Sequence, residues 1–145
     1  MGVMKRKAFF VVAAVCGISL LLNIGLLVHL HEVKTKQIYE EMLAGSITRA
    51  QNLAVDYQLA GSEMTYRYLI GELYVIRLMT SAMESRDYEA VREMYNLSVA
   101  YPAAMQAHMD KVTEILNLME EDYDHPNLGN LIYRLRNEIE IGSDG

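Results

Sequence analysis

The feature that most constrains this chain is an apolar run at residues 8–30, which contains no Asp, Glu, Lys or Arg. A helix of that length is about 35 Å long, enough to cross a hydrocarbon core of roughly 30 Å. Basic residues stand just before the run and favour a cytoplasmic N-terminus. We therefore expect three segments: a cytoplasmic basic N-terminus at residues 1–7, a transmembrane anchor at 8–30 and an extracytoplasmic helical domain at 31–145.

A cleaved signal peptide is the main alternative for this run. Signal peptides have an apolar core of about 7 to 15 residues that ends at small residues. The run is longer, and its end at Val28, His29 and Leu30 offers no pair of small residues. Lipidation of Cys16 is also disfavoured, because Val15 stands where a small residue is required. An uncleaved anchor is therefore the interpretation that we adopt.

Three residues within the run are candidates for packing between membrane helices. Ala13 and Gly17 form a pair of small residues four positions apart, and Asn23 is a polar amide near membrane depth. Small residues allow helices to approach closely, and an amide can form a hydrogen bond between them. Lipid is thus one expected partner, and self-association through this face is an open alternative.

Charge is divided unevenly along the chain. Residues 1–30 carry three basic residues and no acidic one, whereas residues 31–145 carry 10 basic and 19 acidic residues, a net charge of −9. Phosphate binding requires clustered Lys and Arg, so nucleic acid is excluded as an expected partner. Residues 31–145 contain no cysteine, so their stability has to come from a packed core.

Beyond the run, apolar residues recur at alternating spacings of three and four, the period of an amphipathic helix. No stretch alternates every second residue between hairpin turns, so no strands are expected. Breaks are expected at Gly61 with Ser62 as N-cap, at the polar residues 84–87, before Pro102, and at Asp124 as the N-cap of a last helix. The prediction is an all-α fold, with a single N-terminal transmembrane helix followed by an antiparallel helical bundle of four to five helices.

The tyrosines are the least explained feature of the composition. All ten lie beyond residue 31, more than a bundle core of this size requires. Tyr66 and Tyr68 are two residues apart and cannot share one helical face, so at least one of them should lie outside the core. Exposed tyrosine favours a protein partner or a surface that faces lipid headgroups, because its body is apolar and its tip is polar. The alternative is that the tyrosines are partly buried and form hydrogen bonds with loop carbonyls. The residues predicted to form an interaction surface are Tyr66, Tyr68, Tyr74, Tyr88 and Tyr95.

A methionine and histidine group offers a candidate metal site. Met105, His108 and Met109 place two thioethers and one imidazole within five residues, and such soft ligands suit Cu(I). Met79 and Met83 repeat the same spacing on another predicted helix. The alternative is that these methionines fill the core. The acidic turn at 120–125 does not fit the calcium-loop template, because Pro126 and Asn127 stand where further ligands and a glycine are required.

We expect neither enzymatic activity nor a bound cofactor. His108 and His125 are the only candidate bases away from the predicted bilayer surface, and no nucleophile motif or phosphate-binding glycine loop accompanies them. The favoured hypothesis is a membrane-anchored helical adaptor that binds another membrane or envelope protein. The alternative is an extracytoplasmic bundle that senses a small ligand or a soft metal. A homo-oligomer is compatible with either hypothesis.

Overall fold

A computed structural model describes the backbone of residues 2–143 and the side chains of residues 17–140. The chain divides into two compact units, Met1–Ile38 and Tyr39–Gly145. Helix α1, Gly2–Ala60, begins in the first unit and contributes its last third to the second. No strand is present between residues 2 and 143, so the predicted all-α class is confirmed.

The first unit is helical throughout its described residues. Its side chains from Gly17 to Leu30 are mostly apolar, and the polar exceptions are Ser19, Asn23 and His29; Leu21 is 70% exposed and Ile24 is 50% exposed. Among the side chains that are described, no helix is both long and apolar enough to cross a membrane. The side chains of residues 8–16, which belong to the predicted span, are not among those described. The prediction that this segment is helical is therefore confirmed, whereas the prediction that it spans a membrane is not.

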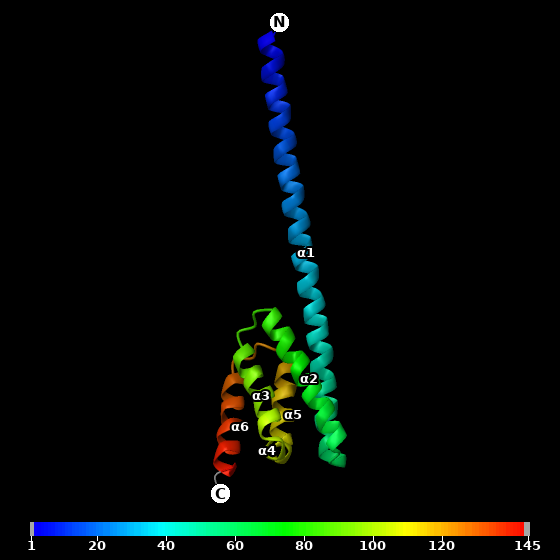
Figure 1. Cartoon of the computed structure of the whole chain (residues 1–145), viewed down its shortest axis with the longest axis vertical. Coiled ribbons are helices and arrows are strands. Elements are labelled where there is room, and N and C mark those ends of the chain that lie inside the picture. Colours follow the sequence, from blue (N-terminus) through cyan, green and yellow to red (C-terminus); the bar gives the residue numbers. More distant parts are fainter. Residues whose placement is uncertain (1, 144–145) are drawn as a thin grey trace. The chain divides into compact units, whose positions relative to one another are not determined.

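The second unit is an antiparallel helical bundle (Figure 1). Residues 39–60 of α1 lead into five further helices, and successive long helices run in opposite directions. Helix α3 packs against α2 and α6, and α5 packs against α6. The five helices after α1 are α2 (Glu63–Ala82), α3 (Tyr88–Ala100), α4 (Pro102–Ala107), α5 (Met109–Glu121) and α6 (Leu128–Ser143).

The core of the bundle follows the predicted spacing of three and four. Each helix turns one apolar stripe inward, because a helix of 3.6 residues per turn brings such positions onto one face. Side chains that are 2% exposed or less come from every one of these helices. Among them are Leu43 and Ala50 from α1, Leu69 and Leu73 from α2, Val91 and Met94 from α3, Met105 from α4, Val112 and Ile115 from α5, and Ile132 and Leu135 from α6.

Polar contacts hold the α1 segment between α2 and α5. Arg49 donates to both carboxylate oxygens of Glu72 on α2, at 2.8 and 3.1 Å. The amide of Gln51, a residue only 8% exposed, donates to the Leu116 carbonyl at 3.3 Å and to the Glu120 carboxylate at 2.9 Å. A buried amide is costly unless it is hydrogen-bonded, so Gln51 fixes the register of α1 against α5.

The predicted break between α1 and α2 is confirmed. Gly61 has a φ of +62°, a left-handed conformation that glycine adopts without strain. Ser62 is the N-cap of α2, and its hydroxyl oxygen accepts from the Thr65 amide at 3.5 Å. The glycine ends one helix and the serine begins the next, as the local sequence indicates.

Two other predicted boundaries are wrong. The helix expected to run on from Pro102 is interrupted at His108, whose amide donates to the Ala104 and Met105 carbonyls and closes α4. Asp124 is not the N-cap of α6, which begins at Leu128. The Asp124 carboxylate instead accepts from the Ser85 hydroxyl and ties the loop before α6 to the loop before α3.

Candidate functional site

The five predicted interaction tyrosines do not lie together: one is buried, one is exposed by itself, and three lie near one another. Tyr66 is 2% exposed, and its hydroxyl donates to the Ser98 carbonyl at 2.8 Å. Burial raises the pKa of Tyr66 above its usual value, because an apolar site disfavours the charged phenolate. Tyr66 is therefore a core residue that no partner can contact. Tyr68, two positions on, is 62% exposed, which agrees with the expectation that the two cannot share a face.

Tyr74, Tyr88 and Tyr95 come together on the surface where α2 packs against α3. The rings of Tyr74 and Tyr95 lie 5.6 Å apart between centroids, and the Arg77 guanidinium lies 5.3 Å from the Tyr95 ring. Seven residues, or two helical turns, separate Tyr88 from Tyr95 on α3, so the two share one helical face. Arg92 lies between them, with its guanidinium 5.9 Å from the Tyr88 ring.

These five side chains, Tyr74, Arg77, Tyr88, Arg92 and Tyr95, are called the tyrosine–arginine face from here on. The face is partly open to solvent: Tyr74 is 44% exposed, and the other four are partly buried. Guanidinium groups over aromatic rings gain cation–π attraction, and the contact holds both side chains in one geometry. The face is thus ordered before any partner arrives, which lowers the entropy cost of binding.

The electrostatics of the face oppose those of the chain as a whole. Within residues 17–140, no carboxylate lies within ion-pair distance of Arg77, and its guanidinium lies over the Tyr95 ring. Arg92 is paired with Glu89, which is 66% exposed. Glu89 thus offsets the charge of Arg92, and Arg77 supplies the positive charge that no described carboxylate pairs at this aromatic surface. Tyrosine and arginine are the residue types enriched at the energetic centres of protein interfaces.

Sequence reasoning located the tyrosines of this face but missed its two arginines. A local signal was present, since Arg77 follows Tyr74 by three residues and Arg92 follows Tyr88 by four. Side chains at these spacings are neighbours on a helix. The sequence does not show how α2 and α3 are aligned against each other, and this alignment places Arg77 of α2 over the Tyr95 ring of α3.

The methionines of the predicted metal site lie in the core. Met105 is 1% exposed and Met109 is 3% exposed, and both pack among buried apolar side chains. His108 lies at the junction of α4 and α5, with its Nδ1 3.7 Å from a carboxylate oxygen of Glu138. Among the described residues, no group of three or more His, Cys, Asp or Glu side chains could hold a metal ion. Cu(I) binding through the thioethers stays a prediction.

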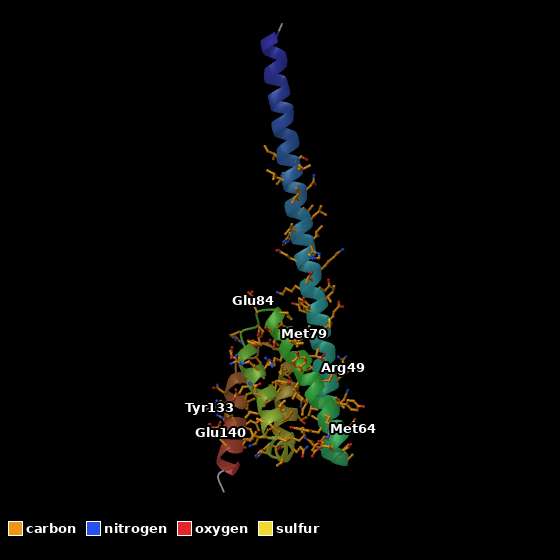
Figure 2. The ribbon with its side chains drawn as sticks, viewed as in Figure 1. Arg49, Met64, Met79, Glu84, Tyr133 and Glu140 are labelled. Carbon is orange, nitrogen blue, oxygen red and sulfur yellow. The ribbon has the colours of Figure 1, made fainter. Side chains whose placement is uncertain are left out.

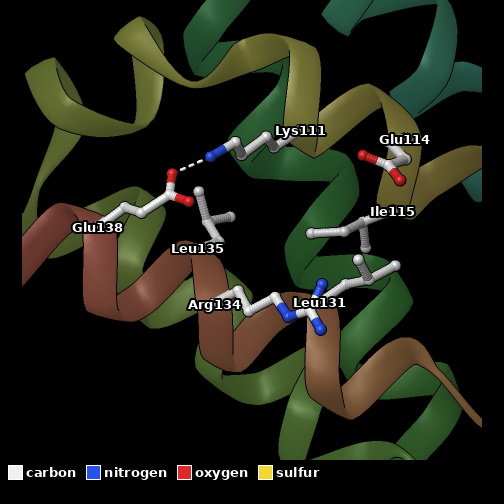
Figure 3. Close-up of a pocket in the computed structure, with 7 residues that line it drawn as sticks. All are labelled: Lys111, Glu114, Ile115, Leu131, Arg134, Leu135 and Glu138. Carbon is white, nitrogen blue, oxygen red and sulfur yellow. Dashed lines mark hydrogen bonds and ion pairs between the residues drawn. The ribbon is translucent and has the colours of Figure 1, made fainter.

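A small groove between α5 and α6 lies beside this junction (Figure 3). Its volume is about 220 Å³. The Lys111 ammonium forms an ion pair with Glu138 across it. Two basic and two acidic side chains line the groove, so their charges cancel and favour no charged ligand. Its lining residues are Lys111, Glu114, Ile115, Leu131, Arg134, Leu135 and Glu138.

The acidic turn at 120–125 serves as a connection between loops. Besides the Ser85 contact, Arg86 donates to the Asp124 carbonyl. Burial raises the pKa of Asp87; Arg86 opposes this effect, and Asp124 and Asp122 add to it. These contacts join the turn, which precedes α6, to the loop that precedes α3, although the two are far apart in the sequence.

The residues proposed for packing between membrane helices lie in the first unit. The side chain of Ala13 falls outside the described side chains. Gly17 and Asn23 are exposed, and a Cβ placed on Gly17 would meet no atom within 4 Å.

Comparison with protein-family models, curated proteins and solved structures gives no match for this chain.

Proposed function

We propose that this chain is a membrane-anchored, non-enzymatic adaptor whose helical domain binds another membrane or envelope protein through the tyrosine–arginine face. The observation that carries the proposal is the cationic aromatic surface at α2–α3, with Arg77 stacked on Tyr95 and unpaired among the described carboxylates. In this proposal the anchor is residues 8–30, the N-terminus is cytoplasmic and the bundle is extracytoplasmic.

Support for the anchor comes from the sequence. The run at 8–30 has no formal charge, and Lys5, Arg6 and Lys7 precede it. Residues 18–30 are mostly apolar, and Leu20, Leu21 and Leu22 are each more than 60% exposed. A helix whose exposed side chains are mostly apolar is stabilised by burial in lipid or protein.

Support for docking comes from the composition of the face. Tyrosine supplies contact area with few rotatable bonds, and arginine supplies a fork of donors that matches a carboxylate. The partner surface that fits is therefore acidic, with apolar groups that pack on the Tyr74 and Tyr95 rings. Residues 31–145 carry a net charge of −9, so an acidic partner is repelled by the domain as a whole and requires local positive charge, such as Arg77, in order to dock.

Cross-linking from intact membranes, followed by affinity purification of the full-length chain, tests the proposal. We expect a stoichiometric partner with the natural chain and at least a tenfold lower yield with Tyr74→Ala or Arg77→Glu. Each change removes a group of the face that we propose as an energetic hot spot, where truncation costs about 2 kcal/mol or more, and a tenfold change corresponds to about 1.4 kcal/mol.

Two matched controls keep this test specific. Tyr133, labelled in Figure 2, and Arg134 lie on α6, whereas the face lies on α2 and α3; Tyr133 is 62% exposed and Arg134 is also exposed. Tyr133→Ala and Arg134→Glu therefore reproduce the chemical changes on a helix that does not carry the face, and they should leave the yield unchanged. An equal loss with the controls, or no loss with the face variants, would contradict docking at this surface.

A further inference from the structure

A second pocket lies between the α1 segment of the bundle and the C-terminal end of α5. Its volume is about 500 Å³, more than twice that of the groove between α5 and α6. Pockets that bind small molecules typically measure about 300 to 1,000 Å³. Four of its lining residues come from α1, two from α5 and one from the loop after α5. All of them belong to the second unit, so this unit forms the pocket by itself.

The floor of this pocket is apolar and consists of core side chains. Ile47 of α1 is 2% exposed and Met119 of α5 is 1% exposed, and both belong to the core of the bundle. Ala44 of α1 also lines the pocket, at an exposed position where a longer side chain would take up part of the space. The part of a ligand that fits this floor is apolar, because contact with it removes apolar surface from water.

The charged part of the lining is negative. Glu40 and Glu120 line the pocket, and none of the described lining residues is basic. The Glu120 carboxylate accepts from the Gln51 amide at 2.9 Å and from the Thr48 hydroxyl at 3.4 Å. Both donors are neutral, and within residues 17–140 Glu120 forms no ion pair. The two hydrogen bonds therefore hold the carboxylate in place and leave its negative charge for a cation.

Tyr123 adds an aromatic ring to the same lining. The residue is partly buried, and burial raises the pKa of its hydroxyl. The carboxylates of Glu40, Asp124 and Asp122 add to this effect, so the ring lies in a negative field. Aromatic rings attract cations as carboxylates do. Ring and carboxylates therefore favour the same kind of ligand group.

We propose that this pocket binds a small primary amine with an apolar body. The Glu40 and Glu120 carboxylates accept from its ammonium group, and its body lies on the apolar floor beside Tyr123. An ammonium group offers three N–H donors, and charge-assisted hydrogen bonds of this kind are about twice as strong as neutral ones. The proposal goes beyond partner docking and does not depend on it, because the tyrosine–arginine face lies on α2 and α3.

Two other kinds of cation fit the pocket less well. The ethanolamine headgroup of a lipid carries a phosphate close to its amine, and the two carboxylates would repel that phosphate. Calcium takes six to eight oxygen ligands, whereas among the described residues no group of three or more His, Cys, Asp or Glu side chains could hold a metal ion. A soluble amine avoids both difficulties.

Calorimetric titration of the full-length chain in a non-ionic detergent tests the proposal, with 2-phenylethylamine as the probe. We expect saturable binding with a Kd of about 0.1 mM, within the ligand-efficiency range for a molecule of this size. The matched neutral probe is 2-phenylethanol, which keeps the body and replaces the ammonium group by a hydroxyl, and it should bind at least tenfold more weakly. Absence of saturable heat with the amine at two temperatures, or equal affinity for the alcohol, would overturn the proposal.

Substitutions then locate the site. Glu120→Gln removes the charge and keeps an acceptor for the Gln51 amide, and Ala44→Leu fills the pocket from an exposed helical position. Each should raise the Kd of the amine at least tenfold, while circular dichroism shows the helix content retained. Glu121→Gln is the matched control, because Glu121 is exposed, follows Glu120 in the sequence and does not line this pocket. It should change the Kd by less than twofold.

Two results of these titrations would contradict an amine site in this pocket. One is an unchanged Kd in either pocket variant, or an equal loss in Glu121→Gln. The other is displacement of the amine by millimolar magnesium or calcium chloride in the natural chain, which would make the site one for inorganic cations. We expect both salts to leave the Kd within twofold of its value without them.

Discussion

Removing the Tyr66 hydroxyl tests how the bundle is held together. Tyr66→Phe keeps the ring, including its contact with Tyr57 at 5.7 Å between centroids, and deletes only the donor that satisfies the Ser98 carbonyl at 2.8 Å. An unsatisfied buried acceptor costs about 1 to 3 kcal/mol. We expect the free energy of unfolding to fall by about 1 to 2 kcal/mol, which lowers Tm by roughly 4 to 8 °C for each kcal/mol in a domain near 100 residues.

Urea unfolding monitored by circular dichroism measures this loss. Tyr133→Phe is the matched control, because Tyr133 is 62% exposed and no described hydrogen bond involves its hydroxyl. The control should change the free energy of unfolding by less than about 0.5 kcal/mol. A loss below that limit in Tyr66→Phe would refute the inference that the Tyr66–Ser98 contact joins α2 to α3.

The same residue predicts a dependence on pH. Burial raises the pKa of Tyr66 in the folded state, so the folded chain favours the neutral phenol. The neutral Tyr66 phenol contributes fully to the free energy of unfolding below pH 10, about the pKa of tyrosine in the unfolded chain. This contribution is lost as the pH rises above that value. The natural chain should therefore lose stability above pH 10 more steeply than Tyr66→Phe, by up to about 1.4 kcal/mol per pH unit. Parallel curves would contradict a buried, neutral Tyr66.

Three further substitutions have predicted outcomes. Met94→Ala empties a fully buried position on α3 and should lower the free energy of unfolding by about 2 to 5 kcal/mol in urea unfolding. Gly71→Ala should raise it by about 0.5 to 1 kcal/mol, since alanine favours helix and a Cβ meets no described atom. Asp87→Asn should raise Tm at pH 7, because burial raises the pKa of Asp87 and disfavours its charged form. That gain should disappear as the pH falls below about 4, where the carboxyl is neutral in both states; a Tm difference independent of pH would contradict the assigned cause.

The parts of the fold that follow from local chemistry were predictable from the sequence. Ser62 caps α2 because its hydroxyl reaches an amide three residues ahead, and Gly61 ends α1 because it adopts a positive φ. The inward stripes follow from helical spacing alone. The divergence of Tyr66 and Tyr68 follows from the same geometry.

What the sequence did not reveal depends on contacts between distant residues. Asp124 resembles an N-cap locally, but its carboxylate is taken by Ser85, 39 positions earlier. The interruption at His108 has no glycine or proline to mark it. The stacking of Arg77 on Tyr95 requires the α2–α3 register, which is set by core packing and not by either helix alone.

Membrane anchorage is the claim on which the proposed function depends. Alkaline carbonate extraction of membranes tests it most directly, with immunoblotting for the full-length chain and mass spectrometry of its N-terminal peptide. The proposed anchor predicts that the chain, with residues 1–30 still attached, stays in the membrane pellet after extraction. Recovery of that same intact chain in the supernatant would contradict the anchor.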